Sequence, residues 1–398
     1  MTVLAVRHRH IHPFPARMAP EVALAKIELL TKPGHVVLDP MCGSGTVIRV
    51  AAEQGRRGIG ADLDPLAVII TGSTCNPGWS TDLAGRADDV LRMARRKRAS
   101  LPTWIANDRE TREFVEYWFG PDQIDDLARI AKVLIDLPRR DNALRLALSR
   151  LIVTKDMGAS LARDTAHSRP HRVRDENDFD VIGAYRASAL RLEKLNTSSS
   201  TWTRSSVRRG DARTLGFVAR NSVDLVVTSP PYLNAIDYLR GHRMSLVWMG
   251  WTVEEVRNLR GETIGAERSL LQEDPSAAEI AREAVPAFSD LPQRHQGMLL
   301  RFTHDIDRIC RTLGRVVKRR GHAVLVVADS QLKGIPIGNA ALCATAGRRH
   351  GFEVVDRQLR PLPAHHRYLP PPTTAPGALS QRMKEEVILT LQKATRRG

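Results

Sequence analysis

Apolar and polar positions near the start of the chain follow first a helical and then a strand-like pattern. Residues 20–31 repeat apolar side chains at helical spacing, and Pro20 suits a first helical turn. Residues 35–38 and 58–61 are short apolar runs typical of buried strands, and helical periodicity covers residues 46–54 between them. A strand, a glycine-rich turn, a helix and a second strand form the first βαβ unit of a doubly wound nucleotide-binding fold.

The pattern changes to mostly helical periodicity between residues 66 and 206. Amphipathic stretches lie at residues 83–98, 123–137, 142–153 and 179–195. Residues 197–206 are rich in Ser and Thr and predict a flexible connector. We therefore expect one α/β domain, formed by residues 1–65 and 207–398, with a helical insertion over residues 66–206.

Strand patterns return in the second half of the chain, at residues 207–208, 223–227, 323–328 and 385–391. A long amphipathic helix is expected over residues 299–317, and an irregular crossing over the proline-rich residues 361–376. The last apolar run, residues 385–393, is expected to close the edge of the sheet. The predicted fold class is thus α/β, with a doubly wound, mostly parallel sheet and a large helical insertion.

The charge of the chain favours a polyanionic partner. Its formal net charge is +16, and an excess of Lys and Arg of this size attracts nucleic acid. A generally basic surface without such a partner is the alternative. The four cysteines are widely spaced and predict a reduced, cytoplasmic protein without a metal site. No segment resembles a signal peptide or a membrane span, so no membrane contact is expected.

The loop that leaves the first strand contains two closely spaced glycines. Gly43 and Gly45 let the backbone turn sharply and approach a ligand closely. Asp62 ends the second strand, where an acidic group typically accepts hydrogen bonds from ribose hydroxyls. No Lys-Ser/Thr pair follows the glycines, which argues against a P-loop.

A rigid tetrapeptide, Ser229-Pro230-Pro231-Tyr232, ends the apolar run at residues 223–227. Neither proline has an N–H group, and Pro231 holds Pro230 in an extended conformation. The Pro230 carbonyl is therefore fixed at the carboxyl end of a strand, beside a hydroxyl and an aromatic ring. These groups are suited to gripping a planar base that carries an exocyclic amino group.

These sequences together resemble the motifs of S-adenosylmethionine-dependent DNA amino-methyltransferases. Ser-Pro-Pro-Tyr is similar to the catalytic tetrapeptide of that family, and residues 39–46 (DPMCGSGT) and 60–65 (GADLDP) are similar to its motifs I and II. Residues 12–17 (HPFPAR) resemble motif X, and residues 209–213 (RGDAR) resemble the third motif. The resemblance covers residues 8–65 and 207–393 and implies a Rossmann-like methyltransferase sheet.

The resemblance implies S-adenosylmethionine as the cofactor. The residues that its motifs assign to cofactor binding are Phe14, Asp39, Pro40, Cys42, Gly43, Gly45, Thr46, Asp62 and Asp211. Purely structural roles are the alternative for some of them: Asp39 as a loop cap, Cys42 as a packing residue and Asp211 as a turn residue. Asp64 is expected to cap the next helix.

The catalytic roles that we assign to the tetrapeptide follow from the chemistry of an amino group. Ser229 Oγ and the Pro230 carbonyl would accept hydrogen bonds from the two N–H groups of the base, and Tyr232 would stack on it. The base must leave the helix stack to reach this pocket. No cysteine follows a proline, which disfavours methylation at C5 of cytosine. By resemblance to the family, serine at the first position of the tetrapeptide implies N4 of cytosine as the target, with N6 of adenine as the alternative.

The motifs run in the order X, I, II, III, IV, as in the γ-like amino-methyltransferases. This chain departs from that pattern because its large insertion lies between motifs II and III. Residues 66–206 are therefore the candidate target-recognition region. Its basic segments predict phosphate contacts by Arg95, Arg96, Arg98, Arg169, Arg172 and Arg174, with a solvated surface as the alternative. The expected partner is double-stranded DNA, and the resemblance adds a cognate restriction endonuclease as a candidate.

Three other functions are compatible with parts of this pattern. An RNA guanine-N2 methyltransferase shares the glycine loop but usually has asparagine in the tetrapeptide and an N-terminal RNA-binding domain, for which too few residues precede motif X. A non-catalytic DNA-binding protein on a methylase fold would not need an intact Ser-Pro-Pro-Tyr sequence. A nucleotide-binding oxidoreductase would leave the tetrapeptide without a purpose.

Overall fold

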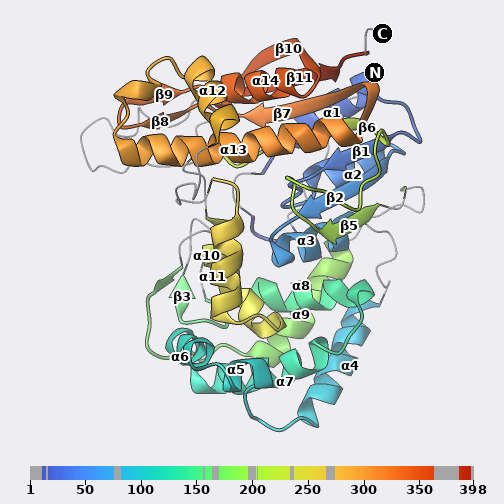
Figure 1. Ribbon diagram of the computed structural model, residues 1–398. Coiled ribbons are helices and arrows are strands. Elements are labelled where there is room, and N and C mark those ends of the chain that lie inside the picture. The colour runs from blue at the N-terminus through green and yellow to red at the C-terminus, as the bar shows by residue number, and fades with distance from the viewer. Residues whose placement is uncertain are drawn as a thin grey trace.

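The computed structural model describes residues 11–14, 17–75, 82–155, 157–163, 170–195, 203, 205–233, 237–265, 274–362 and 385–395. In this part of the chain a seven-stranded sheet lies beside a body of packed helices (Figure 1). The strands of the sheet are β1 (Val36–Asp39), β2 (Arg57–Asp62), β5 (Ser206–Arg209), β6 (Val223–Thr228), β7 (Val317–Val327), β10 (Phe352–Pro361) and β11 (Glu385–Lys393). Two short pairs lie outside it: β3 (Ala162–Arg163) with β4 (His171–Arg172), and β8 (Ser330–Leu332) with β9 (Ile335–Ile337).

The sheet has the strand order β10-β11-β7-β6-β1-β2-β5. β11 runs antiparallel to β7 and β10, and the other paired strands of this sheet are parallel. The chain leaves β1 toward β2 on one side and reaches β6 on the other, so the strand order reverses at β1. Ligands of open α/β sheets bind at such a switch point, outside the carboxyl ends of the strands. The predicted doubly wound, mostly parallel sheet is confirmed.

Helices cover both faces of the sheet. They are α1 (Pro20–Leu30), α2 (Thr46–Glu53), α12 (Pro275–Ala284), α13 (Gln293–Val316) and α14 (Asn339–Arg349). Successive strand residues point to opposite faces. Val37 and Leu225 therefore share a core with α1 and α2, whereas Leu38 and Val226 share a second core with α12, α13 and α14. This alternation fixes the register of β1 against β6, in which Val37 is opposite Leu225.

The remaining helices form a second body, which we call the helical body. They are α3 (Pro65–Cys75), α4 (Leu83–Arg95), α5 (Thr103–Ala106), α6 (Arg109–Trp118), α7 (Pro121–Leu134), α8 (Asn142–Ile152), α9 (Val181–Leu195), α10 (Tyr238–Leu246) and α11 (Val253–Glu262), and 3₁₀ turns lie at Arg139–Asp141, Val247–Met249 and, outside this body, Phe288–Asp290. α3 lies between the sheet and the rest of the helical body and contacts both (Figure 1). Phe119, Tyr185 and Trp248 are fully buried in its core. The helical body thus includes α10 and α11, which follow the tetrapeptide, as well as helices of the expected insertion.

The end of the chain differs from the prediction. β11 does not close the edge of the sheet, because β10 pairs with it and forms the edge. β10 was not found from the sequence because most of its side chains are exposed and its apolar residues do not alternate with polar ones, whereas β11 is mostly apolar and buried. The predicted helix over residues 299–317 is confirmed as the longer α13. Most of the predicted connector and of the proline-rich crossing lies outside the described residues. Among the described helices, none is both long and apolar enough to cross a membrane.

Candidate active site

The glycine loop and the tetrapeptide lie next to each other at the switch point. β1 and β6 are neighbours, and Thr228, the last residue of β6, donates a hydrogen bond from Oγ1 to Asp39 Oδ1 at 2.8 Å. Asp39 is buried, and it also accepts a hydrogen bond from the amide of Met41 at 3.2 Å. Burial raises the pKa of Asp39 to about 7, although both hydrogen bonds act in the opposite direction. The two predicted motifs therefore lie side by side.

The glycine loop has a backbone that only glycine adopts readily. Gly43 and Gly45 have φ angles of +45° and +82°. A Cβ atom at Gly45 would lie 2.9 Å from Thr71 Oγ1, which donates a hydrogen bond to the carbonyl of Gly43. A Cβ atom at Gly43 would lie 3.1 Å from the ring of Phe14. Phe14 thus covers the loop, where motif X was predicted to lie.

Asp62 connects the end of β2 to the glycine loop. Its Oδ2 accepts a hydrogen bond from the amide of Gly43 at 2.9 Å, and its Oδ1 accepts one from the amide of Asp64 at 3.0 Å. Burial, and then the charge of Asp64, raises the pKa of Asp62 to about 7. The carboxylate therefore lies beside the loop in which cofactor binding is expected.

Phe14 belongs to an aromatic cluster that joins the glycine loop to α10. Its ring stacks on Tyr238 with ring centroids 4.9 Å apart, and His242 lies at 5.5 Å. His242 is buried, and its Nδ1 is 2.5 Å from Asp64 Oδ2. Asp64 also accepts a hydrogen bond from the amide of Leu66 at the start of α3, which confirms its predicted capping role. The contact of His242 with Asp64 was not predicted, because nothing local in the chain indicates that α10 packs beside motif II.

The hydroxyl of Ser229 donates its proton within the protein and can still accept hydrogen bonds. Ser229 Oγ donates a hydrogen bond to the carbonyl of Val326 in β7 at 2.9 Å. A hydroxyl has one proton and two lone pairs, so this bond leaves Oγ as an acceptor toward the site. Tyr232 Oη lies 3.5 Å from the same oxygen, and burial raises the pKa of Tyr232 to about 12. Pro230 is buried directly after Ser229, and Pro231 is half-buried.

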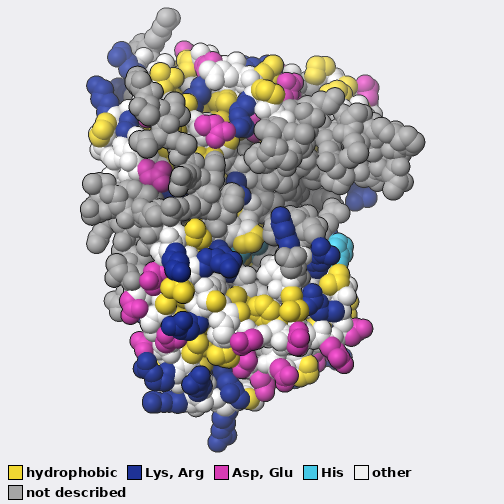
Figure 2. Space-filling view, turned by 180° about the vertical axis from the view of Figure 1, so that it is seen from behind, with side chains coloured by type: hydrophobic (Ala, Val, Ile, Leu, Met, Phe, Trp, Pro, Cys, Tyr) yellow, Lys and Arg dark blue, Asp and Glu magenta, His cyan; other side chains and the backbone are white. Residues whose placement is uncertain are grey.

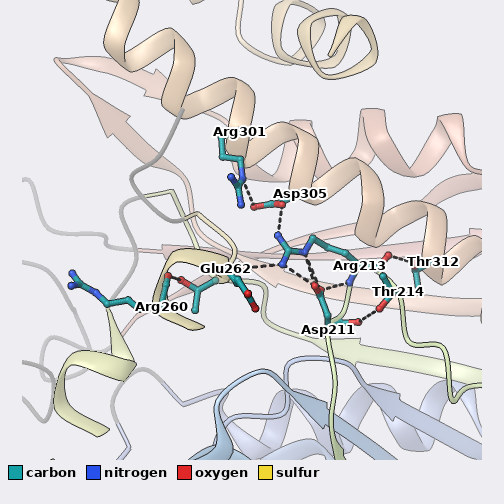
Figure 3. A network of polar contacts seen from close by, with 9 residues as sticks. Asp211, Arg213, Thr214, Arg260, Glu262, Arg301, Asp305 and Thr312 are labelled. Carbon is teal, nitrogen blue, oxygen red and sulfur yellow. Dashed lines mark hydrogen bonds and ion pairs between the residues drawn. The ribbon is translucent and has the colours of Figure 1, made fainter. Parts of the chain in front are cut away.

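The predicted third motif is held by a network of arginine and acid groups (Figure 3). Arg213 donates hydrogen bonds to both carboxylate oxygens of Asp211 and a further one to Asp305 on α13 at 2.8 Å. It also reaches the carbonyl of Glu262 at the end of α11, at 2.8 Å. Asp211 thus lies near the sheet rim, but its carboxylate is already engaged by a guanidinium.

The other predicted cofactor residues take part in packing the loop. Cys42 is buried with Ile48 and Cys75, its amide donates to the carbonyl of Ala61 at 2.8 Å, and burial raises the pKa of its thiol. Pro40 is buried beside it, and Thr46 begins α2. The packing alternative for Cys42 is thus the one its surroundings favour. Within the described residues, no group of acids, histidines and cysteines could hold a metal ion.

The arginines predicted to contact DNA lie on different parts of the helical body. Arg95, Arg96 and Arg98 are exposed at the end of α4, and Figure 2 shows Lys and Arg side chains gathered at the end of the molecule opposite the sheet. Arg172 lies 4.8 Å over the exposed ring of Tyr117.

The two remaining arginines of this set give no further evidence on phosphate contact. Arg174 is half-buried, and Arg169 lies outside the described residues. Their predicted phosphate contacts stay predictions.

Comparison with known proteins adds independent findings. Residues 4–71 match the family model of N6 and N4 DNA methylases. The chain is 22% identical over 441 residues to the type II methyltransferase M.MvaI of Kocuria varians, and the match covers 97% of this chain and 90% of that protein.

Solved structures with detectable likeness are more distant. The rRNA methyltransferase AviRa of Streptomyces viridochromogenes is 10% identical, with a TM-score of 0.33, and the match covers 96% of this chain and 88% of that one. TTHA0409, a candidate DNA modification methylase of Thermus thermophilus, is 20% identical over 47% of this chain and 51% of its own, with a TM-score of 0.24.

Proposed function

We propose that this chain, a member of the S-adenosylmethionine-dependent DNA methyltransferases, methylates an exocyclic amino group of a base flipped out of double-stranded DNA, and that the target is N4 of cytosine. The DNA methylase family match and the similarity to a type II methyltransferase support the reaction class. They also favour DNA over RNA as the substrate and an enzyme over a non-catalytic binding protein.

The groups around the glycine loop fit the cofactor S-adenosylmethionine. This cofactor supplies an electrophilic methyl group on a positively charged sulfur. Asp62, at the end of β2 and beside the glycine loop, would accept hydrogen bonds from ribose hydroxyls. Phe14 offers an aromatic face over the loop, and such a face attracts a cation. The left-handed backbone of Gly43 and Gly45 leaves the loop free of side chains that would block approach.

The observation that carries the proposal is the hydrogen bond from Ser229 Oγ to the carbonyl of Val326. It fixes the hydroxyl proton on the protein side and leaves the oxygen as an acceptor for an N–H of the base. The Pro230 carbonyl, in a backbone held by two prolines, is the second acceptor. Two acceptors favour the charge that builds on the amino nitrogen as it attacks, and therefore stabilise the transition state more than the ground state.

Tyr232 holds the base in the plane that this attack requires. Its phenol is neutral at physiological pH even at the ordinary pKa of 10.0, and burial raises this pKa further, to about 12. A neutral aromatic ring stacks on a base without placing an anion beside the reacting nitrogen. N6 of adenine offers the same two N–H groups and is the alternative target.

The reaction class is tested by methyl transfer from methyl-labelled S-adenosylmethionine. The purified chain is incubated with genomic DNA from a bacterial strain without methylases, or with total RNA from the same strain. We expect label in DNA and none in RNA. Label in RNA alone would refute the proposal, and so would binding of the cofactor without transfer to either nucleic acid.

A further inference from the structure

Three arginines lie beside the site without a role in the chemistry described above. They are Arg240 and Arg243 on α10 and Arg260 at the end of α11. α10 begins at Tyr238, whose ring stacks on Phe14, and Phe14 in turn touches the glycine loop. α11 runs from the helical body toward the sheet (Figure 1). We call these three residues the arginine rim.

The positive charges of Arg260 and Arg240 both act on the guanidinium of Arg243, and the carboxylates of Glu110 and Asp237 oppose them. Burial lowers the pKa of Arg243, and the charges of Arg260 and then Arg240 contribute to the same shift. The Arg243 guanidinium lies 4.5 Å over the ring of Phe114 on α6, which orients it. Its Nε is buried and has no hydrogen-bond partner among the described residues. Packing therefore holds like charges together at this position.

The nearby carboxylates neutralise only one of the three arginines. Glu110 binds both terminal nitrogens of a different arginine, Arg257, at 2.6 and 2.7 Å. Asp237 pairs with Arg260 and also caps α10. Within the described part of the chain, neither Arg240 nor Arg243 has a carboxylate at ion-pair distance. Arg240 is exposed in the first turn of α10, where the helix dipole disfavours a positive charge.

We propose that the arginine rim grips backbone phosphates of the DNA strand that carries the flipped base. This inference rests on the proposed function and specifies the surface by which the chain would hold DNA. Guanidinium groups bind phosphate through paired hydrogen bonds, and an incoming phosphate would relieve the repulsion within the rim. Because α10 also carries Tyr238, which stacks on Phe14, phosphate contact at the rim would bring the strand toward the glycine loop.

The test measures how salt weakens binding of the full chain to a fluorescently labelled 30-base-pair DNA duplex. Each phosphate contact contributes about 0.9 to the slope of log K against log salt concentration. We expect Arg240→Gln and Arg243→Gln each to lower this slope by about 0.9. Arg243→Lys should keep it, because the charge remains. The matched control is Arg357→Gln, an exposed arginine on the edge strand β10, which should bind with the slope of the unchanged protein.

The outcomes separate this inference from the proposed function. Unchanged slopes in both Arg240→Gln and Arg243→Gln would show that the arginine rim does not bind DNA phosphates, whether or not the protein methylates DNA. No detectable duplex binding by the unchanged protein would show the same. The slope could fall in these variants while the unchanged protein transfers no methyl group to DNA. That result would support phosphate binding by the arginine rim and refute the proposed function. Arg240 is exposed, so its replacement keeps the test valid even if Arg243→Gln fails to fold.

Discussion

Ser229 is the residue on which the proposed chemistry depends most. Replacing it with alanine removes one acceptor for the amino group and leaves the glycine loop untouched. We expect Ser229→Ala to lower the rate of methyl transfer by about 10²–10³-fold, the usual effect of losing one transition-state hydrogen bond. Equilibrium dialysis with labelled cofactor should show unchanged binding. Ser222→Ala, at the amino end of β6, is the control and should keep full activity.

Asp39 makes the stability of the cofactor-free protein depend on pH. Its pKa is raised from an ordinary value of 3.8 to about 7, so the folded protein holds this proton more tightly than the unfolded chain. The stabilisation is complete below about pH 4 and is lost as the pH rises through about 7. In Asp39→Asn the side chain is an amide that does not ionise, so this contribution to stability does not change with pH.

We therefore expect the melting temperature of Asp39→Asn, relative to the unchanged protein, to rise between pH 5 and pH 8 in a series of thermal melts. A constant difference over that range would show that Asp39 is already ionised at pH 5.

At the scale of elements, the glycine loop combines a left-handed backbone with close contact to α3. Gly45→Ala strains a residue at φ +82° and places a methyl group against Thr71, whereas Gly34→Ala strains a residue at φ +83° in open space. Both should lose on the order of 1 kcal/mol of stability from the backbone alone. Only Gly45→Ala should also weaken cofactor binding, by more than about tenfold. Equal cofactor affinity in the two variants would show that the glycine loop does not contact the cofactor.

Tyr238 joins α10 to the segment that contains Phe14. Removing the stacked ring in Tyr238→Ala costs about 0.5–1.5 kcal/mol of ring contact, which corresponds to about a 2–10-fold loss of cofactor affinity. Tyr238→Phe keeps the ring and should bind the cofactor like the unchanged protein. If both variants bind equally well, Phe14 does not need α10 to cover the loop.

The sequence predicted the elements whose patterns are local. β1, β2 and β6 were found because each is a short buried run, and the glycine loop was found because Gly43 and Gly45 follow such a run directly. β10 was missed because an edge strand exposes most of its side chains and lacks apolar alternation. The partnership of His242 with Asp64 could not be predicted, since it joins residues far apart in sequence through the packing of α10 against α3.

For the whole molecule, the important arrangement is the joining of two bodies at the carboxyl edge of the sheet. The sheet provides the glycine loop and the tetrapeptide, while the helical body provides α10, α11 and their arginines. The end of α11 is tied to the third motif through the hydrogen bond from Arg213 to the carbonyl of Glu262 (Figure 3). The predicted insertion ended at residue 206, because helical periodicity does not reveal that α10 and α11, which follow the tetrapeptide, share its core.

The identity of the methylated nucleoside tests the central claim most directly. DNA from a strain without methylases is incubated with the protein and S-adenosylmethionine, digested to nucleosides and analysed by chromatography and mass spectrometry against standards. We predict N4-methylcytosine, made by the unchanged protein and lost in Ser229→Ala. N6-methyladenine would change the target base but keep the amino-group mechanism. The appearance of 5-methylcytosine, or of no methylated base, would contradict the account.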